Sequence, residues 1–282
     1  MANANGWGDG ASNNNIGWGK GADNAIGWGD IHADSYAGLT DIVGIASFDN
    51  TKSILLGGID DYIDCGDSND FSFGNGTTDS SFSISAWVKM DVTGTFGILN
   101  KYGGTSTTSE YLFGFTASNK LQLVLTKSNT LFVYRGRRQN VTLNTGEWYH
   151  VLGTYDGRGG NLAQEGIRLY VNGVRVDDTD ENYGGGYTAM SNTSTPVLIG
   201  KQTLNYSDGN IDEVAVFNTE LSASDVTSIY NSGIPNDISS LNPVGWWRCG
   251  DGDTSPILTD NGSGGNNGTM TNFTTFSTDV PI

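Results

Sequence analysis

From Asp49 onward the chain consists largely of short runs in which apolar and polar residues alternate, and this alternation constrains the fold more than any other feature. Between Phe82 and Met90 every second residue is apolar. A period of two places alternate side chains on opposite faces of a β-strand. Similar runs follow at 111–115, 121–125, 131–134, 148–155 and 167–171. Many short strands separated by turn signals predict an antiparallel sandwich or barrel.

Two local signals refine this prediction. Asn172-Gly173 lies between two apolar runs, and both residues accept the positive φ angles of a type I′ turn, so a β-hairpin is expected there. A helix is expected to begin at Ser222, whose hydroxyl can cap the amide of Asp225, and to end at Gly233. Its apolar face would comprise Val226, Ile229 and Tyr230. One short helix among many strands favours the all-β class.

The first 47 residues differ from the rest because they contain a short repeat. Three Gly-Trp-Gly units occur at 5–10, 16–21 and 26–31. Such a period is too short for a helical repeat, and three indole rings cannot be buried by so glycine-rich a segment alone. The alternatives are a flexible leader or an arm that docks on another surface, and we favour docking. The predicted docking residues are Trp7, Trp18 and Trp28.

Composition excludes several classes of function. Acidic residues outnumber basic ones 31 to 14, giving a net charge of −17, so nucleic acid would be repelled. No run approaches the ~18 apolar residues of a membrane span, and the N-terminus does not resemble a secretion signal. We therefore expect no membrane insertion and a product made in the cytoplasm. Two histidines and two cysteines offer little material for His-based catalysis, zinc binding or a disulfide framework.

Six runs carry a family resemblance. They are GGIDDYIDCGDSNDFSF, FSISAWVKM, TGEWYHVLGTYDG, IRLYVNGVRV, PVLIGK and GNIDEVAVFNTELSASDVTSIYNSG, in that order. From about Ser53 to Gly233 the chain resembles laminin-G-like domains of the concanavalin A-like lectin/glucanase superfamily. The resemblance implies an all-β, two-sheet antiparallel jelly-roll sandwich that commonly binds carbohydrate or protein and often contains calcium.

One departure from the family concerns the C-terminus. The segment 245–272 resembles the opening of such a domain, although here it comes last. Either a second copy is truncated or the domain is permuted, and we favour permutation because the termini of a sandwich usually lie close together. The predicted organisation is a docking arm at 1–47 and a sandwich at 48–282, with 243–282 completing it.

Permutation would bring Cys249 near Cys65, so a disulfide is one outcome. Two buried, reduced thiols are the expected one for a cytoplasmic product.

The resemblance also suggests which residues could take part in catalysis or in metal binding. Glucanases of this fold usually carry a pair of catalytic carboxylates in an ExDxE pattern, which is missing here, so we expect no enzyme. His150 would be a packed or hydrogen-bonded residue of a strand. Calcium is the candidate cofactor, with Asp61 and Asp212 as its ligands, because they match the family's DDY and IDEV motifs. The alternative is that each of these carboxylates only accepts hydrogen bonds from loop amides. The basic stretch at 135–138 and the acidic stretch at 177–181 are both interpreted as solvated turns, although the basic stretch could also contact an anionic glycan or a partner chain.

An acidic chain without a secretion signal, with a repeat-bearing N-terminal arm and one laminin-G-like sandwich, resembles tailed-phage virion proteins. The predicted function is a non-enzymatic head fibre, capsid decoration or tail appendage, located in the virion. Its arm would dock on other virion proteins, and its lectin-like domain would touch glycans or a host surface. A homo-oligomer is expected, a trimer by preference, since several weak sites then act together. The alternatives are a bacterial carbohydrate-binding adhesin module and a polysaccharide depolymerase.

Overall fold

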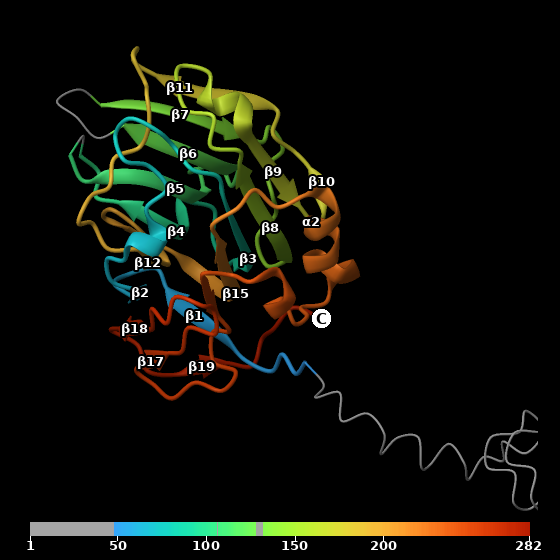
Figure 1. The fold of residues 1–282 in the computed structure, drawn as a ribbon. Helices are drawn as coiled ribbons and strands as arrows, with labels where there is room; N and C mark the ends of the chain where they lie inside the picture. The colour runs from blue at the N-terminus through green and yellow to red at the C-terminus, as the bar shows by residue number, and fades with distance from the viewer. Residues whose placement is uncertain (1–47, 106, 128–131) are drawn as a thin grey trace, which may run out of the picture. The chain divides into compact units, whose positions relative to one another are not determined.

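A computed structural model describes residues 48–282, apart from 106 and 128–131. These residues form two antiparallel sheets with little helix, as Figure 1 shows. The predicted all-β, two-sheet sandwich is therefore confirmed. The docking arm with Trp7, Trp18 and Trp28 lies outside the described residues, so the arm and its boundary at residue 47 stay predictions.

The first sheet has the strand order β10-β9-β8-β3-β15-β1-β19, and β16 pairs with β15 beside β1. Its strands are β1 (Ser53–Gly57), β3 (Phe82–Met90), β8 (Trp148–Tyr155), β9 (Ile167–Val171), β10 (Val174–Arg175), β15 (Asp208–Phe217), β16 (Gly245–Trp247) and β19 (Phe276–Ser277). Neighbouring strands that are distant in sequence, such as β3 and β15, give the sheet its long-range connections.

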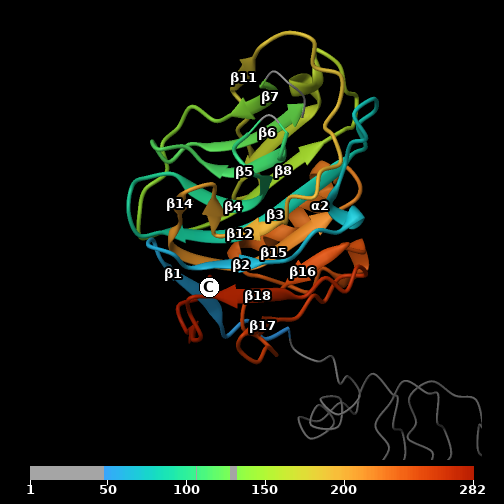
Figure 2. The same cartoon turned by 90° about the vertical axis from the view of Figure 1, so that its left-hand side faces the viewer.

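The second sheet has the order β11-β7-β6-β5-β4-β12-β2-β18-β17. Its strands are β2 (Tyr62–Asp64), β4 (Phe96–Tyr102), β5 (Ser109–Phe115), β6 (Leu121–Lys127), β7 (Val133–Arg138), β11 (Thr179–Tyr183), β12 (Leu198–Ile199), β17 (Ile257–Leu258) and β18 (Gly268–Thr271). A separate hairpin joins β13 (Lys201–Gln202) to β14 (Asn205–Tyr206), and Figure 2 shows β14 beside β4. Short 3-10 turns occupy Asn69–Phe71, Ala163–Gly166, Asn231–Gly233 and Ser239–Leu241.

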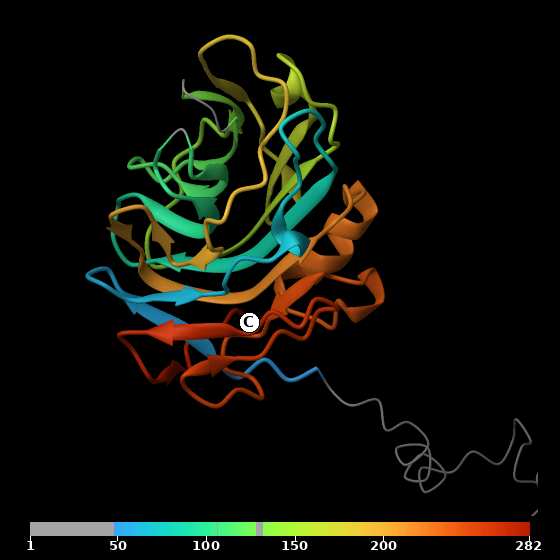
Figure 3. The same ribbon diagram turned by 60° about the vertical axis from the view of Figure 1, so that its left-hand side comes forward.

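The core lies between the two sheets, which Figure 3 shows as separate layers. The apolar alternation of β3 places Ile84 and Val88 in this core, and both side chains are fully buried. From the second sheet, Phe113 of β5 and Leu123 of β6 pack into the same cluster. Each such side chain stabilises the fold by about 1.5–3 kcal/mol relative to an exposed position. The apolar residues therefore alternate in the sequence because every second side chain of these strands is buried between the two sheets.

The hairpin and the helix lie where the sequence placed them. Asn172 and Gly173 have φ angles of 49° and 75°, as the I′ turn requires. Helix α2 (Ala223–Tyr230) begins with a capping box between Ser222 and Asp225. Its end was predicted wrongly. The left-handed C-cap is Asn231, not Gly233, because a short polar side chain tolerates that conformation.

The C-terminal segment contributes strands to both sheets. β16 pairs with β15, β18 pairs with β2, and β19 pairs with β1. The indole of Trp247 is fully buried, lies 5.7 Å from the ring of Phe71, and donates to the backbone oxygen of Asn266 at 3.0 Å. Whether this arrangement reflects a permuted domain stays a prediction.

Lys101 on β4 and Glu110 on β5 form a buried ion pair at the second sheet. Both side chains are fully buried, and the ammonium nitrogen lies 3.4 Å from a carboxylate oxygen of Glu110. The ammonium also donates to Asp67 at 2.5 Å and to the backbone oxygens of Thr193 and Thr195 at 3.1 and 2.6 Å. Burial raises the pKa of Glu110, while the charge of Lys101 opposes that shift.

No helix in the described part of the chain is long and apolar enough to span a membrane.

Candidate functional site

The outer surface of the second sheet carries a row of aromatic rings. Since Phe113 and Leu123 point into the core, the alternate residues of these strands point away from it. A cavity of about 280 Å³ opens on this surface. Its lining comprises Tyr102, Leu112, Gln122, Val124, Phe132, Tyr134, Glu181 and Gln202. We call these residues, together with Tyr183 of β11, the tyrosine face.

Four rings of the tyrosine face contact one another in sequence. Tyr102 meets Phe132 edge to face, with ring centroids 6.3 Å apart, and Phe132 meets Tyr134 in the same way at 5.8 Å. Tyr134 stacks on Tyr183 at 5.7 Å. The row arises because Tyr134 and Tyr183 are direct neighbours across β7 and β11. Tyr183 is 59% exposed, so this end of the row is open to solvent.

Polar groups border the rings. Glu181 forms an ion pair with Arg138 at 2.6 Å, and both side chains are partly exposed. The side-chain oxygen of Gln202 is buried but accepts no hydrogen bond within the described residues. An unsatisfied acceptor costs free energy unless a ligand or water donates to it. The tyrosine face therefore offers flat apolar rings, one paired carboxylate and an available amide oxygen.

The hydroxyls of Tyr102 and Tyr134 stay protonated near neutral pH. Burial raises the pKa of Tyr134, and the charge of Glu181 raises it further. Burial likewise raises the pKa of Tyr102, with a smaller contribution from Tyr134. Neutral hydroxyls can both donate and accept hydrogen bonds.

The basic and acidic stretches beside this surface are not the solvated turns that the sequence suggested. The basic residues belong to β7 and the acidic ones lead into β11, and the two strands pair antiparallel. Arg137 contacts Asp180 at 3.0 Å in addition to the pair formed by Arg138. Arg135 is 5% exposed and donates to backbone oxygens. Cross-strand pairing of opposite charges explains why these residues occur in strands.

The predicted calcium ligands lie on different elements, Asp61 in the loop between β1 and β2 and Asp212 on β15. Asp61 follows β1 and accepts from the amide of Gly57 at 2.8 Å. Asp212 on β15 is fully buried and accepts from Asn50 at 3.0 Å. Since Ile211 pairs with Ile54, Asp212 lies level with Ser53, which is roughly 13 Å along β1 from Gly57, the contact of Asp61. The structure therefore does not bring the two carboxylates together.

Within the residues that the structure describes, no group of three or more His, Cys, Asp or Glu side chains is arranged to hold a metal ion. A role for Asp61 or Asp212 in binding calcium stays a prediction. Burial raises the pKa of Asp212, and the neighbouring Glu213 raises it further.

The remaining residues singled out from the sequence are structural. His150 is fully buried, its Nε2 lies 2.8 Å from the hydroxyl of Ser85, and burial lowers its pKa to about 3. The prediction of a packed, hydrogen-bonded histidine is confirmed. Cys65 and Cys249 are both free and buried, as expected for reduced thiols.

Sequence reasoning missed the tyrosine face. The available signal was the phase of the alternation in β7, where Tyr134 lies between two inward residues, Val133 and Arg135. A large aromatic residue at an outward position of a strand is a reason to look for a binding surface. Its partner Tyr183 could not be found this way, because β11 was not predicted as a strand.

The fold defines a lectin-like β-sandwich with an aromatic outer face. The family model for the concanavalin A-like lectin/glucanases superfamily, in its laminin-G form, matches residues 56–227. The chain belongs to this superfamily. No curated protein sequence matches it.

Several solved structures are similar. A candidate carbohydrate-binding protein from Bacteroides ovatus has 19% identity and a TM-score of 0.53, over 81% of this chain and 62% of that chain. This chain therefore spans less than two thirds of that protein. The carbohydrate-binding module of a Ruminococcus gnavus sialidase, bound to α2,3-sialyllactose, has 12% identity and a TM-score of 0.44 over 65% and 99% of the two chains. Domain 4 of a Geobacillus stearothermophilus arabinanase, in complex with arabinotriose, has 16% identity and a TM-score of 0.41 over 63% and 76%. At these identities the likeness concerns the fold alone.

Proposed function

We propose that this protein binds glycans through the tyrosine face and does not cleave them. The observation that carries the proposal is the open row of rings from Tyr102 to Tyr183 beside amide and carboxylate groups. The apolar faces of sugar rings stack on aromatic side chains, and polar groups beside the rings fix the orientation of the hydroxyls. The description of the Bacteroides ovatus protein as a candidate carbohydrate-binding protein supports this function.

The charges of the tyrosine face favour a neutral glycan. Its carboxylate, Glu181, is already paired with Arg138, so the arginine is not available to a sialic acid or uronic acid. The net charge of −17 also repels an anionic chain at a distance. Among the residues that line the cavity, Glu181 is the carboxylate, whereas glycoside hydrolysis uses two. Binding without cleavage fits this lining.

Replacing Tyr134 by alanine should weaken binding of a neutral oligosaccharide roughly 10- to 30-fold, because Tyr134 contacts rings on both sides. A glycan array first identifies the oligosaccharide, and calorimetry then measures its affinity with and without a chelator. The chelator arm also tests the calcium prediction. Tyr183→Ala should cost a similar factor, whereas Tyr183→Phe keeps the ring and should bind nearly as well as the wild type.

The matched surface control is Val174→Ala on β10 of the other sheet, where the side chain is 65% exposed. It should leave affinity unchanged. Unaltered affinity in Tyr134→Ala would remove the tyrosine face as the binding surface. Release of reducing ends from the bound polysaccharide would show an enzyme instead.

We further propose that the glycan-binding domain serves a virion as a head fibre, capsid decoration or tail appendage, with the arm at 1–47 docking on other virion proteins. The support is the repeat of Trp7, Trp18 and Trp28, because three large apolar indole rings are stabilised by packing against another surface. If this is right, mass spectrometry of purified particles should detect the chain, and the three Trp→Ala changes together should remove it from them. A chain absent from particles would favour an adhesin module.

A further inference from the structure

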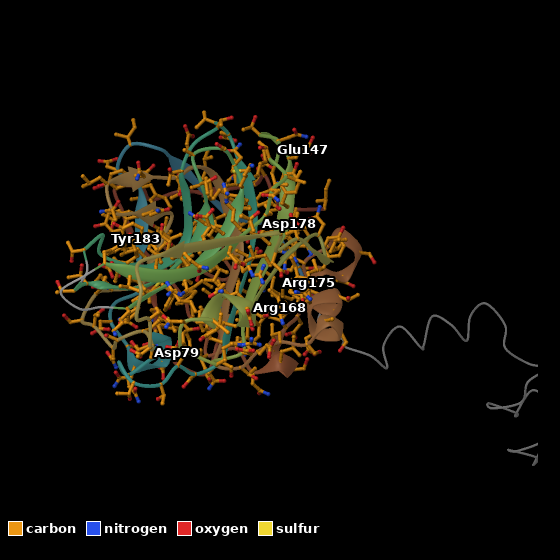
Figure 4. The ribbon with its side chains drawn as sticks, turned by 90° about the horizontal axis from the view of Figure 1, so that it is seen from above. Asp79, Glu147, Arg168, Arg175, Asp178 and Tyr183 are labelled. Carbon is orange, nitrogen blue, oxygen red and sulfur yellow. The ribbon has the colours of Figure 1, made fainter. Side chains whose placement is uncertain are left out.

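A second cavity, of about 330 Å³, shares no lining residue with the tyrosine face. It lies between the turn before β3, the loop after β8, and the segment that follows β11. Its lining comprises Thr77, Thr78, Asp79, Gly157, Arg158, Gly159, Gly160 and Thr188. Figure 4 labels both Asp79 and Tyr183, and the two side chains lie well apart in this view. The cavity is therefore a separate feature of the surface.

Asp79 is held rigidly in this cavity by neutral donors. One carboxylate oxygen accepts from the amide of Met190 at 2.8 Å. The other accepts from the hydroxyls of Tyr155 and Tyr187 at 2.8 and 3.0 Å. Tyr155 is itself fixed, because its oxygen accepts from the amide of Gly159 at 2.7 Å. The orientation of the carboxylate is thus set before any ligand arrives.

This carboxylate has no cationic partner among the residues that the structure describes. Within the described residues, no Lys or Arg nitrogen lies within 4.0 Å of Asp79. Arg158 lines the cavity, but its guanidinium contacts Asp156 at 2.6 Å and Glu165 at 3.4 Å. Burial raises the pKa of Asp79 to about 6, and the three hydrogen bonds only partly oppose that shift. A partly desolvated carboxylate of this kind gains most from an added positive charge.

The rest of the lining is polar and open. Three threonines line the cavity, Thr77, Thr78 and Thr188. The hydroxyls of Thr77 and Thr188 donate to neighbouring oxygens of the protein, which leaves their own oxygens able to accept from a ligand. A Cβ atom built at Gly160 would meet nothing within 4 Å, so the cavity is accessible on that side. Hydroxyl-rich walls around one carboxylate suit a hydroxylated ligand more than an apolar one.

We propose that this cavity binds a small hydroxylated ligand that carries a protonated amine, of the amino-sugar class. The ammonium group pairs with Asp79, and the hydroxyls of the ligand contact the threonines at the border. The net charge of −17 assists by attracting cations to the surface. This site is independent of glycan binding by the tyrosine face.

The test is a titration with glucosamine, compared with glucose and N-acetylglucosamine, which lack the charged amine. Glucosamine should bind roughly tenfold more tightly at pH 7 than at pH 5, because the ionised fraction of Asp79 rises through its pKa of about 6 while the amine stays protonated. Among the other groups near Asp79, the pKa values of Tyr155, Tyr187 and Arg158 are raised and that of Asp156 is lowered, so these four should not titrate in this range. Glu165 forms an ion pair with Arg158 at 3.4 Å.

Two variants locate the site. Asp79→Asn should abolish the pH dependence and weaken glucosamine binding at least tenfold. Because Asp79 also holds two tyrosines, Thr78→Trp provides a second variant that fills the cavity from its exposed rim and leaves Asp79 in place. Val174→Trp, on another surface, is the control and should bind normally.

Tyr134→Ala should also retain glucosamine binding, which separates this proposal from the function of the tyrosine face. The proposal is overturned if glucosamine does not bind, if N-acetylglucosamine binds equally well, or if Thr78→Trp leaves glucosamine affinity unchanged.

Discussion

A chain that ends at Asn242 should fail to show a cooperative unfolding transition. The truncation removes β16, β17, β18 and β19, so β15, β2 and β1 each lose one of their pairing partners. It also removes Trp247, whose buried indole packs on Phe71. Lost pairing and an opened core together exceed the 5–15 kcal/mol that usually separates a folded from an unfolded domain. Circular dichroism during urea titration is the measurement.

A single substitution tests the same interface more gently. Trp247→Ala should lower the free energy of unfolding by about 3–5 kcal/mol, since it leaves a cavity where a large ring was fully buried. Deletion of Ile282, which is 96% exposed, is the control and should cost almost nothing. A native-like transition in the truncated chain would mean that residues 243–282 are an appendage and not part of the sandwich.

Lys101→Met should lower the free energy of unfolding by about 3–5 kcal/mol, because Glu110 then stays in the core without a positive partner. The loss should depend on pH. Burial already raises the pKa of Glu110, and removing the ammonium raises it further, so the folded state binds a proton more readily than the unfolded chain. The deficit relative to wild type should therefore shrink as the pH falls from 7 toward 5.

Two further variants test whether the lost stability comes from the buried charge of Glu110. In the double variant Lys101→Met, Glu110→Gln no charge remains buried, so part of the lost stability should return. Lys120→Met changes a lysine that is partly exposed and should alter stability by less than about 0.5 kcal/mol. Equal stability of Lys101→Met and wild type would mean that the buried pair contributes no net free energy.

The sequence predicted best those elements whose signal is local. β3, β8 and β9 have the boundaries expected from the runs at 82–90, 148–155 and 167–171, because alternation directly reflects burial on one face. The capping box of α2 was also found, since its residues lie three apart. The end of α2 was misplaced because asparagine can adopt the left-handed conformation that glycine usually supplies.

The elements that were missed depend on pairing between distant segments. The acidic residues of β11 form a strand because β7 presents arginines opposite them, and neither stretch shows this alone. The tyrosine face has the same origin, since Tyr134 and Tyr183 meet only through that pairing. The hydrogen-bond donors to the Asp79 carboxylate likewise come from distant segments, Tyr155 from β8 and Tyr187 and Met190 from the segment after β11. The spacing of these residues in the sequence does not indicate that they lie close together in the fold.

The pairing of β1 with β19 decides how the sandwich would be held by anything attached to it. Ser53 and Ser277 lie side by side, so the chain enters and leaves the domain at one edge. β7 and β11, which carry Tyr134 and Tyr183, lie at the far edge of the other sheet (Figure 1). A tether attached at either end of the domain would therefore hold the edge formed by β1 and β19. The rings of Tyr134 and Tyr183, at the opposite edge, would stay accessible to a ligand.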